Sequence, residues 1–381
     1  MNIAIVAVGY NRPDSMSRLL KSICMAEFYT DRVDLIISID KGQKQAEIVK
    51  YAESVVWNHG NKVIRAFSER QGLRLHILQC GDLTTEYDAV VILEDDLIVS
   101  PYFYSYVKQA VSYYKSDFRI AGISLYKHEF HPGVQRPFQP ENNGYDCYMM
   151  QFAQSWGQCW TKEMWAEFRE WYNNNEDKDL SEGKILPDYV AGWNQHSWMK
   201  YYMRYICEND KYFVYPHVSL TSNGSDVGQH SKVLINDYQI PLLQGDLDYR
   251  FPKFEHAVKY DVYFERIGFE EVLQSRYHGI VLLDLNGNRN NFEGADYALS
   301  VRNLPYKIVE CYGLVHRPIE ENVLYPEKGK GIYLYDLKSP ETNKIDGNLL
   351  TRYDVKGINW KRLLSLGMQG LKEALLRRVQ R

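Results

Sequence analysis

The chain has no long apolar run, no paired cysteines and no strong excess of charge. None of its hydrophobic stretches approaches the roughly 20 residues that cross a bilayer as a helix. Its six cysteines are scattered without a CxxC pair, which argues against a zinc site or a disulfide framework and fits a reducing compartment. The net charge is -4, with 25% charged residues, so the overall charge does not indicate nucleic-acid binding.

The first residues also lack the features of a secretion signal. Residues 1–8 read MNIAIVAV, without a basic segment or a small-residue cleavage site. We therefore predict a first strand at this position and a cytoplasmic protein. With 381 residues, the chain is long enough for one large domain with an appendage or for two domains.

The most informative stretch covers residues 89–99, where apolar residues run into Glu94, Asp95 and Asp96 before an apolar triplet resumes. A short apolar run rich in Val and Ile predicts a strand that is buried on both faces. Three unpaired acids do not belong in a core, so we expect them at the end of that strand. Open α/β folds bind ligands at this edge, and clustered carboxylates suit a divalent cation with its phosphate oxygens. For the triplet alone, a solvated acidic turn is the alternative.

Strand and helix patterns alternate through this part of the chain. We predict strands at residues 3–8, 35–39, 62–66, 89–93, 120–125 and 212–216, with helices between most of them. Such alternation predicts an α/β fold with a mainly parallel sheet flanked by helices.

The pattern changes at about residue 240, where prolines and a denser mixture of tyrosine and charge begin. We predict one domain over residues 1–235 and a smaller α+β region over residues 236–381. Its last segment, residues 360–381, has leucines on one face and carries six basic residues against one acid. A basic amphipathic helix of this kind can lie on an anionic membrane, here the inner face, or can dock on its own domain.

Four stretches, in this order, resemble the nucleotide-sugar glycosyltransferases of GT-A fold. The resemblance is to the N-acetylglucosaminyltransferase I type and to bacterial relatives that build surface polysaccharides. It rests on VGYNRP at 8–13, ISIDKG at 37–42, LEDDLIVSPYF at 93–103 and WGQCWTKEMWAEF at 156–168. It covers residues 1–235 and implies a hexosyl- or N-acetylhexosaminyltransferase of GT-A fold. The donor would be a nucleotide sugar, most often a UDP-sugar, and the acceptor a glycan or lipid-linked saccharide.

The resemblance also implies a metal site that uses Mn²⁺ or Mg²⁺. Asp96 would ligate the metal, and His230 would lie near the diphosphate as a second metal candidate, with a plain surface histidine as the alternative. Asp95 would face the ribose or a metal-bound water, and Glu94 would face the nucleotide. A divalent cation is useful there because it stabilises the charge that develops on the diphosphate leaving group.

The nucleotide base would occupy the ends of the first two strands in proteins of this family. By the resemblance, Asp40 would accept a hydrogen bond from the base, while Gly9, Asn11 and Arg12 would line the same pocket. For Asp40, the alternative is that an Asp at the end of a strand simply caps a helix.

The catalytic base is not identified by the resemblance. The N-acetylglucosaminyltransferase I type has an Asp just before a Trp, whereas this chain reads WNQHSW at 193–198. Inverting transfer needs a group that takes the proton of the acceptor hydroxyl. His196 at the aligned place and Asp226 in a glycine-rich loop are our first candidates, followed by Asp188 upstream. The stereochemical outcome stays open.

Aromatic residues and rival functions complete the predictions. We expect one of Trp156, Trp193 and Trp198 to stack on a sugar, with the others in the core.

One rival function is a sugar nucleotidyltransferase, although residues 9–12 match its glycine-rich phosphate loop poorly. The other is a catalytically inactive glycan-binding module, which the missing Asp before Trp198 would favour.

Overall fold

The chain divides into two compact units, which are described separately. The computed structural model describes residues 1–224, 226, 238–355 and 357–379, with side chains as far as residue 372. Unit 1 comprises Met1–Ser275 and Asn288–Glu293, and unit 2 comprises Arg276–Gly287 and Gly294–Arg381. This division falls later than the predicted boundary at residue 235.

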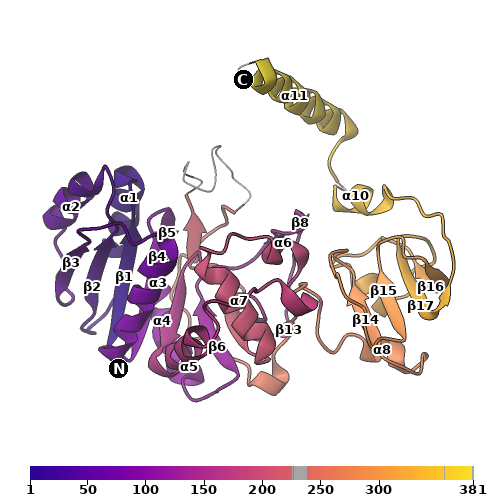
Figure 1. The fold of residues 1–381 in the computed structure, drawn as a ribbon, viewed down its shortest axis with the longest axis horizontal. Coiled ribbons are helices and arrows are strands. Elements are labelled where there is room, and N and C mark those ends of the chain that lie inside the picture. Colours follow the sequence, from indigo (N-terminus) through magenta and orange to yellow (C-terminus); the bar gives the residue numbers. More distant parts are fainter. Residues whose placement is uncertain (225, 227–237, 356, 380–381) are drawn as a thin grey trace. The chain divides into compact units, whose positions relative to one another are not determined.

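Unit 1 is built on one nine-stranded sheet that is mainly parallel, which confirms the predicted α/β class (Figure 1). The strand order is β13-β9-β11-β6-β10-β4-β1-β2-β3. The strands are β1 (Ile3–Gly9), β2 (Asp34–Ile39), β3 (Lys62–Ala66), β4 (Ala89–Glu94), β6 (Ile120–Ser124), β9 (Cys147–Met150), β10 (Gln158–Thr161), β11 (Tyr212–Pro216) and β13 (Lys259–Tyr260). Strands β1 to β4 are mutually parallel, whereas β10 runs antiparallel to both β4 and β6.

Helices cover both faces of this sheet, which explains why its strands are apolar without alternation. In β1, Ile3, Ile5 and Ala7 pack into one core with α1, α2 and α4. The intervening residues of β1 pack into a second core with α3, α5 and α7. The helices are α1 (Pro13–Cys24), α2 (Gln45–Ser54), α3 (Leu73–Gly81), α4 (Phe103–Tyr114), α5 (Lys162–Asn173), α6 (Asp188–Ala191), α7 (Trp198–Glu208) and α8 (Glu271–Gln274).

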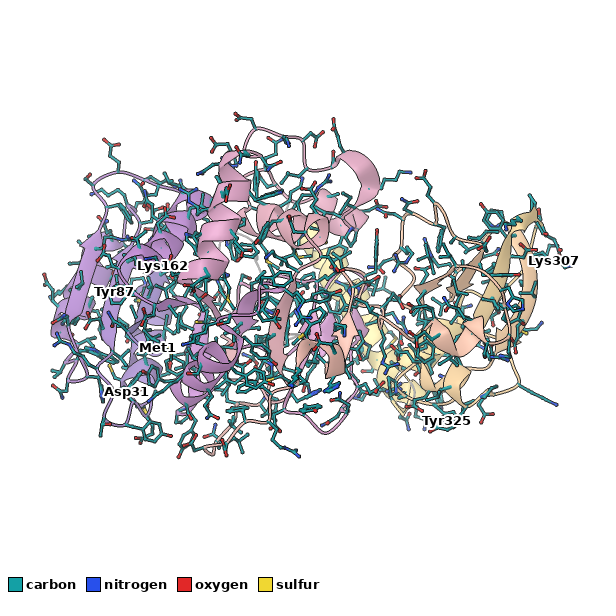
Figure 2. The ribbon with its side chains drawn as sticks, turned by 90° about the horizontal axis from the view of Figure 1, so that it is seen from below. Met1, Asp31, Tyr87, Lys162, Lys307 and Tyr325 are labelled. Atoms are coloured by element: carbon teal, nitrogen blue, oxygen red, sulfur yellow. The ribbon has the colours of Figure 1, made fainter. Side chains whose placement is uncertain are left out.

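The strand directions define two opposite ends of the sheet, one at the amino ends of the parallel strands and the other at their carboxyl ends. Asp31, Tyr87 and Lys162 are labelled in Figure 2 and lie in the segments at the amino ends of β2 and β4 and at the carboxyl end of antiparallel β10. Lys162 donates its backbone N–H to the carbonyl of Asp88 over 3.1 Å, and this bond joins the segments next to β10 and β4 at the amino end of β4. The acidic triplet follows β4 at the opposite edge.

Short strand pairs complete unit 1. Strand β5 (Leu97–Val99) pairs antiparallel with β12 (Thr221–Asn223), and β7 (Phe130–His131) pairs with β8 (Arg136–Pro137). The β5–β12 pair matters for function because it brings a distant segment to the residues that follow the acidic strand.

Unit 2 is a smaller α+β structure with a four-stranded sheet of order β14-β15-β17-β16. Strands β14 and β15 are parallel, and β17 runs antiparallel to both β15 and β16. The elements are β14 (Val281–Asp284), β15 (Tyr297–Ser300), β16 (Tyr306–Tyr312), α9 (Glu321–Leu324), β17 (Ile332–Pro340), α10 (Leu349–Asp354) and α11 (Trp360–Val379). Among the described residues, no helix has both the length and the apolar composition that crossing a membrane requires.

Candidate functional site

The acidic triplet lies where the strand order of unit 1 reverses. From β1 the chain passes to β2 on one side, whereas β4 adds to the other side of β1. Val8 of β1 is in register with Glu94 of β4, so the segments that follow these two strands start at the same edge. In open α/β sheets, this reversal point is where ligands bind.

Arg12 joins the segment after β1 to the acids after β4. Its guanidinium forms an ion pair with the Asp95 carboxylate and donates from Nη1 to Asp96 Oδ2 over 3.2 Å. The Tyr10 backbone N–H donates to Asp95 Oδ2 over 3.3 Å. The remaining oxygen, Asp96 Oδ1, is buried and has no hydrogen-bond partner among the described residues. One buried carboxylate oxygen at the strand end is therefore left without a hydrogen-bond partner among the described residues.

The three carboxylates carry more negative charge than Arg12 compensates. Burial raises the pKa of Asp95 to about 6 against the opposing charge of Arg12, and the charge of Asp96 raises it further. Burial and the charge of Asp96 also raise the pKa of Glu94. Burial alone would lower the pKa of Arg12, but Asp95 and Asp96 together raise it. Added positive charge is therefore favourable here.

Asp226 joins this group through the β5–β12 pair. The Gly224 N–H donates to the Asp96 carbonyl over 2.6 Å, which directs the chain toward α1. The Asp226 carboxylate accepts from Ser15 Oγ over 2.8 Å and is paired with Arg18. Burial raises the pKa of Asp226, but the bonds from Arg18 and Ser15 outweigh it and lower the pKa. Asp226 is thus ionised at neutral pH.

Glycine is needed at position 224 for this approach. A Cβ there would collide with the Arg18 guanidinium and would lie 2.9 Å from the Asp96 carbonyl oxygen. Sequence reasoning missed Arg18 and the role of Ser15, although their spacing of three residues is a signal for one helix face.

The other two candidate bases lie apart from this group. Asp188 is exposed at the start of α6 and accepts from Asn290 Nδ2 over 2.7 Å. His196 is exposed in the loop before α7, where its backbone N–H donates to Asn194 Oδ1 over 2.9 Å. Among the described residues, neither has a hydrogen bond or ion pair with the acidic triplet. Their catalytic roles stay predictions.

The Asp40 carboxylate accepts hydrogen bonds from three backbone N–H groups. Asp40 is 4% exposed, and its carboxylate accepts from the N–H groups of Gln71 over 2.7 Å and Gly72 over 3.0 Å. It also accepts from the Lys41 N–H over 2.8 Å. Gln71 and Gly72 directly precede α3, so two of these bonds hold the start of a helix, as the alternative proposed, and the contact of Asp40 with a base stays a prediction.

The other residues expected to contact the nucleotide also make local contacts. Asn11 Oδ1 accepts from the Lys44 N–H over 3.0 Å, so Asn11 anchors the turn after β2. A Cβ at Gly9 would collide with Met16 and would lie 3.7 Å from Asp95 Oδ2. The glycine thus allows α1 to pack close behind the acids.

The three tryptophans occupy different environments. Trp198 is 2% exposed and packs edge-on against Trp160, which makes it a core residue. Trp193 is half-buried near Tyr189. Trp156 is half-buried, and its carbonyl accepts from Thr221 Oγ1 of β12 over 2.5 Å. Its ring centroid lies 4.4 Å from that of Tyr238. Through β12, Trp156 is the one connected to the acidic site.

The carboxylate oxygens of Asp95 and Asp96 suit a hard divalent cation. Among the described residues, there is no group of three or more His, Cys, Asp or Glu side chains that could hold a metal. His230 lies outside the described residues. A cation such as Mg²⁺ commonly takes one or two carboxylates and fills its shell with waters and substrate phosphates. Asp96, with its open oxygen beside Asp95, meets that need.

Comparisons with known proteins give structural likeness only. No family model matches the chain, and no curated protein matches its sequence. Similar solved structures include S. aureus TarS 1–349 in complex with UDP-GlcNAc, at 11% identity and a TM-score of 0.38, covering 60% of each chain. GalNAc-T7 with UDP, GalNAc and Mn²⁺ has 13% identity and a TM-score of 0.40, covering 61% of this chain and 46% of that one.

A third similar structure is the mannosyltransferase PcManGT from Pyrobaculum calidifontis in complex with GDP-Man and Mn²⁺. It has 13% identity and a TM-score of 0.31, covering 45% of this chain and 46% of that one. The chain spans 36% of full TarS and 61% of the 1–349 fragment. At this level of similarity, the site itself has to support any functional conclusion.

Proposed function

We propose that the protein is a metal-dependent glycosyltransferase that moves a sugar from a nucleotide-sugar donor to a glycan or lipid-linked acceptor. We propose a UDP-sugar as the donor, and surface polysaccharide synthesis at the cytoplasmic face as the setting. The observation that carries the proposal is the buried, unpartnered Oδ1 of Asp96 at the strand reversal. An open carboxylate oxygen there favours a cation that brings a diphosphate with it.

The chain's own residues would divide the work as follows. Asp96 would hold Mn²⁺ or Mg²⁺ through Oδ1, and Asp95 would orient the site from its bond with the Tyr10 N–H. The metal, when bound, supplies Lewis-acid stabilisation of the leaving diphosphate. Arg12 and Arg18 add fixed positive charge on the side of α1, where it would complement phosphate oxygens.

Asp226 is our preferred catalytic base because its contacts bring it near Asp96. It is ionised, which is the state in which a carboxylate accepts a proton. Its ion pair with Arg18 weakens it as a base, so Arg18 would need to turn toward the diphosphate when the donor binds. His196 and Asp188 follow as candidates.

Donor cleavage tests the proposal. The protein is incubated with a panel of nucleotide sugars and Mn²⁺, and the released nucleotide is identified. We expect nucleoside diphosphate from one donor, no release with Asp96→Ala, and unchanged release with Asp177→Asn, an exposed acid in the loop after α5.

The released product distinguishes the rival functions. Pyrophosphate formed from a sugar phosphate and a nucleoside triphosphate would identify a nucleotidyltransferase instead. Binding of glycan without release from any donor, and without metal-dependent nucleotide binding, would identify an inactive glycan-binding module. Release that survives Asp96→Ala would show that the metal assignment is wrong.

A further inference from the structure

Helix α11 presents an apolar face that the chain leaves exposed. Trp360, Leu364, Met368 and Leu371 are exposed by 65%, 56%, 62% and 66% of their surface. At 3.6 residues per turn, these four positions fall within an arc of about 80°. Large apolar side chains on one exposed face mark a surface that another partner covers.

Basic residues border this face. Lys361 and Lys372 follow directly on one edge of the apolar arc, and both are exposed. Residues 360–381 contain six basic residues and one acid, whereas the whole chain has a net charge of -4. The rest of the chain is therefore net acidic, whereas this terminal segment is net basic.

We infer that α11 binds the surface of an anionic lipid bilayer, lying in the plane of the interface. Its apolar arc would enter the acyl boundary while the bordering lysines reach the headgroups. Trp360 suits this position because indole rings favour the membrane–water interface. The inference does not depend on the proposed sugar transfer.

A second copy of the chain is a less suitable partner. The apolar residues Leu364, Met368, Leu371 and Leu375 follow the alternating spacing of a coiled-coil seam. The seam positions before and after them are Lys361 and Arg378, so the seam covers only about two heptads, short of the three or four that indicate a coiled coil.

Two glycines also weaken a seam in water. Gly367 and Gly370 lie inside the helix, and each lowers helix stability by about 1 kcal/mol relative to alanine. At a bilayer interface, burial of the whole apolar face compensates for the loss of helix stability that the two glycines cause.

The test is flotation of the full chain with vesicles of phosphatidylcholine alone or mixed with phosphatidylglycerol, at low and high ionic strength. We expect binding that needs phosphatidylglycerol and weakens with salt. A charge variant carries Lys361→Gln and Lys372→Gln, the two lysines that border the apolar arc. Each removed charge should lower partitioning about fivefold, or about twenty-fivefold for both.

A second variant carries Leu364→Gln, Met368→Gln and Leu371→Gln. Its partitioning to the mixed vesicles should fall by at least about tenfold. The matched control replaces Met25 and Val56 of unit 1, which are 76% and 74% exposed, by glutamine and should bind as the parent does. Circular dichroism and tryptophan emission check that all variants are folded.

Three results would overturn the inference. They are binding without phosphatidylglycerol, equal loss in the Met25/Val56 control, and no binding to either vesicle. In the last case, sedimentation velocity would tell whether the leucines instead hold two copies together. Donor release measured without vesicles tests the proposed function separately.

Discussion

Units 1 and 2 each bury an aspartate against an arginine, yet the two pairs are completed differently. In unit 2, Asp284 is fully buried, and its Oδ2 accepts from Ser300 Oγ over 2.6 Å and from Arg302 Nε over 2.7 Å. In unit 1, Arg12 serves both Asp95 and Asp96, and one Asp96 oxygen is left without a partner among the described residues. The comparison separates a pair that closes a fold from one that leaves capacity for a ligand.

Replacing the two aspartates should separate function from structure most strongly. We expect Asp96→Asn to slow nucleoside diphosphate release roughly ten-thousandfold or more, equivalent to ~5 kcal/mol of barrier, because the open ligand oxygen loses its charge. Asp284→Asn should lower the unfolding temperature and leave the turnover of folded protein unchanged. For both variants, we would measure the turnover per folded molecule and the thermal melting temperature. Equal loss of turnover in both would break the comparison.

Removing the arginines should show which pair a metal can replace. Arg12→Ala leaves Asp95 buried without its partner and should cost about 4 kcal/mol of unfolding free energy. Arg302→Ala should cost less, because Ser300 still donates to the Asp284 carboxylate and because the Arg302 side chain is 38% exposed and partly screened by solvent. Mn²⁺ with a nucleoside diphosphate should restore the melting temperature of the Arg12 variant only.

The control for this prediction is the parent protein, melted with and without the same ligands. An equal Mn²⁺ shift in the parent and in both arginine variants would mean that the metal does not replace the charge of Arg12, and no shift in any of them would mean that the metal does not bind at the acids of unit 1.

The histidines extend the contrast between the units to acid stability. In unit 1, His131 is fully buried, and burial lowers its pKa to about 4, with the nearby charge of Arg136 adding to this. His128 is also buried with a lowered pKa. In unit 2, His278 is exposed and His316 is half-buried. Unit 1 therefore holds buried histidines whose neutral form is favoured in the folded state.

His131 should make unit 1 sensitive to mild acid. Its folded pKa of about 4 lies below the ordinary value of 6.5, so the unfolded chain binds more protons between these values. Its contribution is complete above pH 6.5 and is lost as the pH falls toward 4, which amounts to about 3 kcal/mol. His131→Asn should remove this part of the pH dependence, and His278→Asn should not.

Urea unfolding at several pH values measures this difference. Seven of the eight tryptophans belong to unit 1 and one, Trp360, to unit 2, so tryptophan emission follows mainly unit 1. The raised pKa values of Asp95 and Glu94 act in the opposite direction, so the comparison is made between variants and not from the parent curve alone. Equal slopes for both histidine variants would contradict the prediction.

The local pattern predicted six of the nine strands of the main sheet and missed β9, β10 and β13. Runs such as residues 3–8 and 89–93 are apolar throughout because both faces of the sheet are covered, and this is visible in the sequence alone. The end of β4 could be predicted to within one residue, because a run of acids rarely continues a buried strand, although β4 includes Glu94 and Asp95 is buried beside Arg12. The α/β class followed from these elements.

The partners of the acids could not be predicted in this way. Arg12 is 83 residues from Asp95, and Arg18 is 208 residues from Asp226, so these pairs depend on strand order and on the β5–β12 contact. The extent of unit 1 beyond residue 235 depends on contacts of the same kind, and the domain boundary at 235 stays a prediction. Residues after 235 have little periodicity, yet the Met149 N–H donates to Val258 over 2.9 Å and β13 extends the sheet.

The smallest effect is expected from His196, which the sequence offered as a base candidate on a level with Asp226. Its side chain is exposed, and its backbone serves the loop before α7. We expect His196→Ala to change turnover by no more than about twofold, within the range of ordinary surface substitutions. Asp226→Asn should lower turnover by about a hundredfold or more, as removal of a general base does. If the two variants exchanged these effects, the base would belong to the loop before α7, and the Asp226–Arg18 pair would be structural, like Asp284–Arg302 in unit 2.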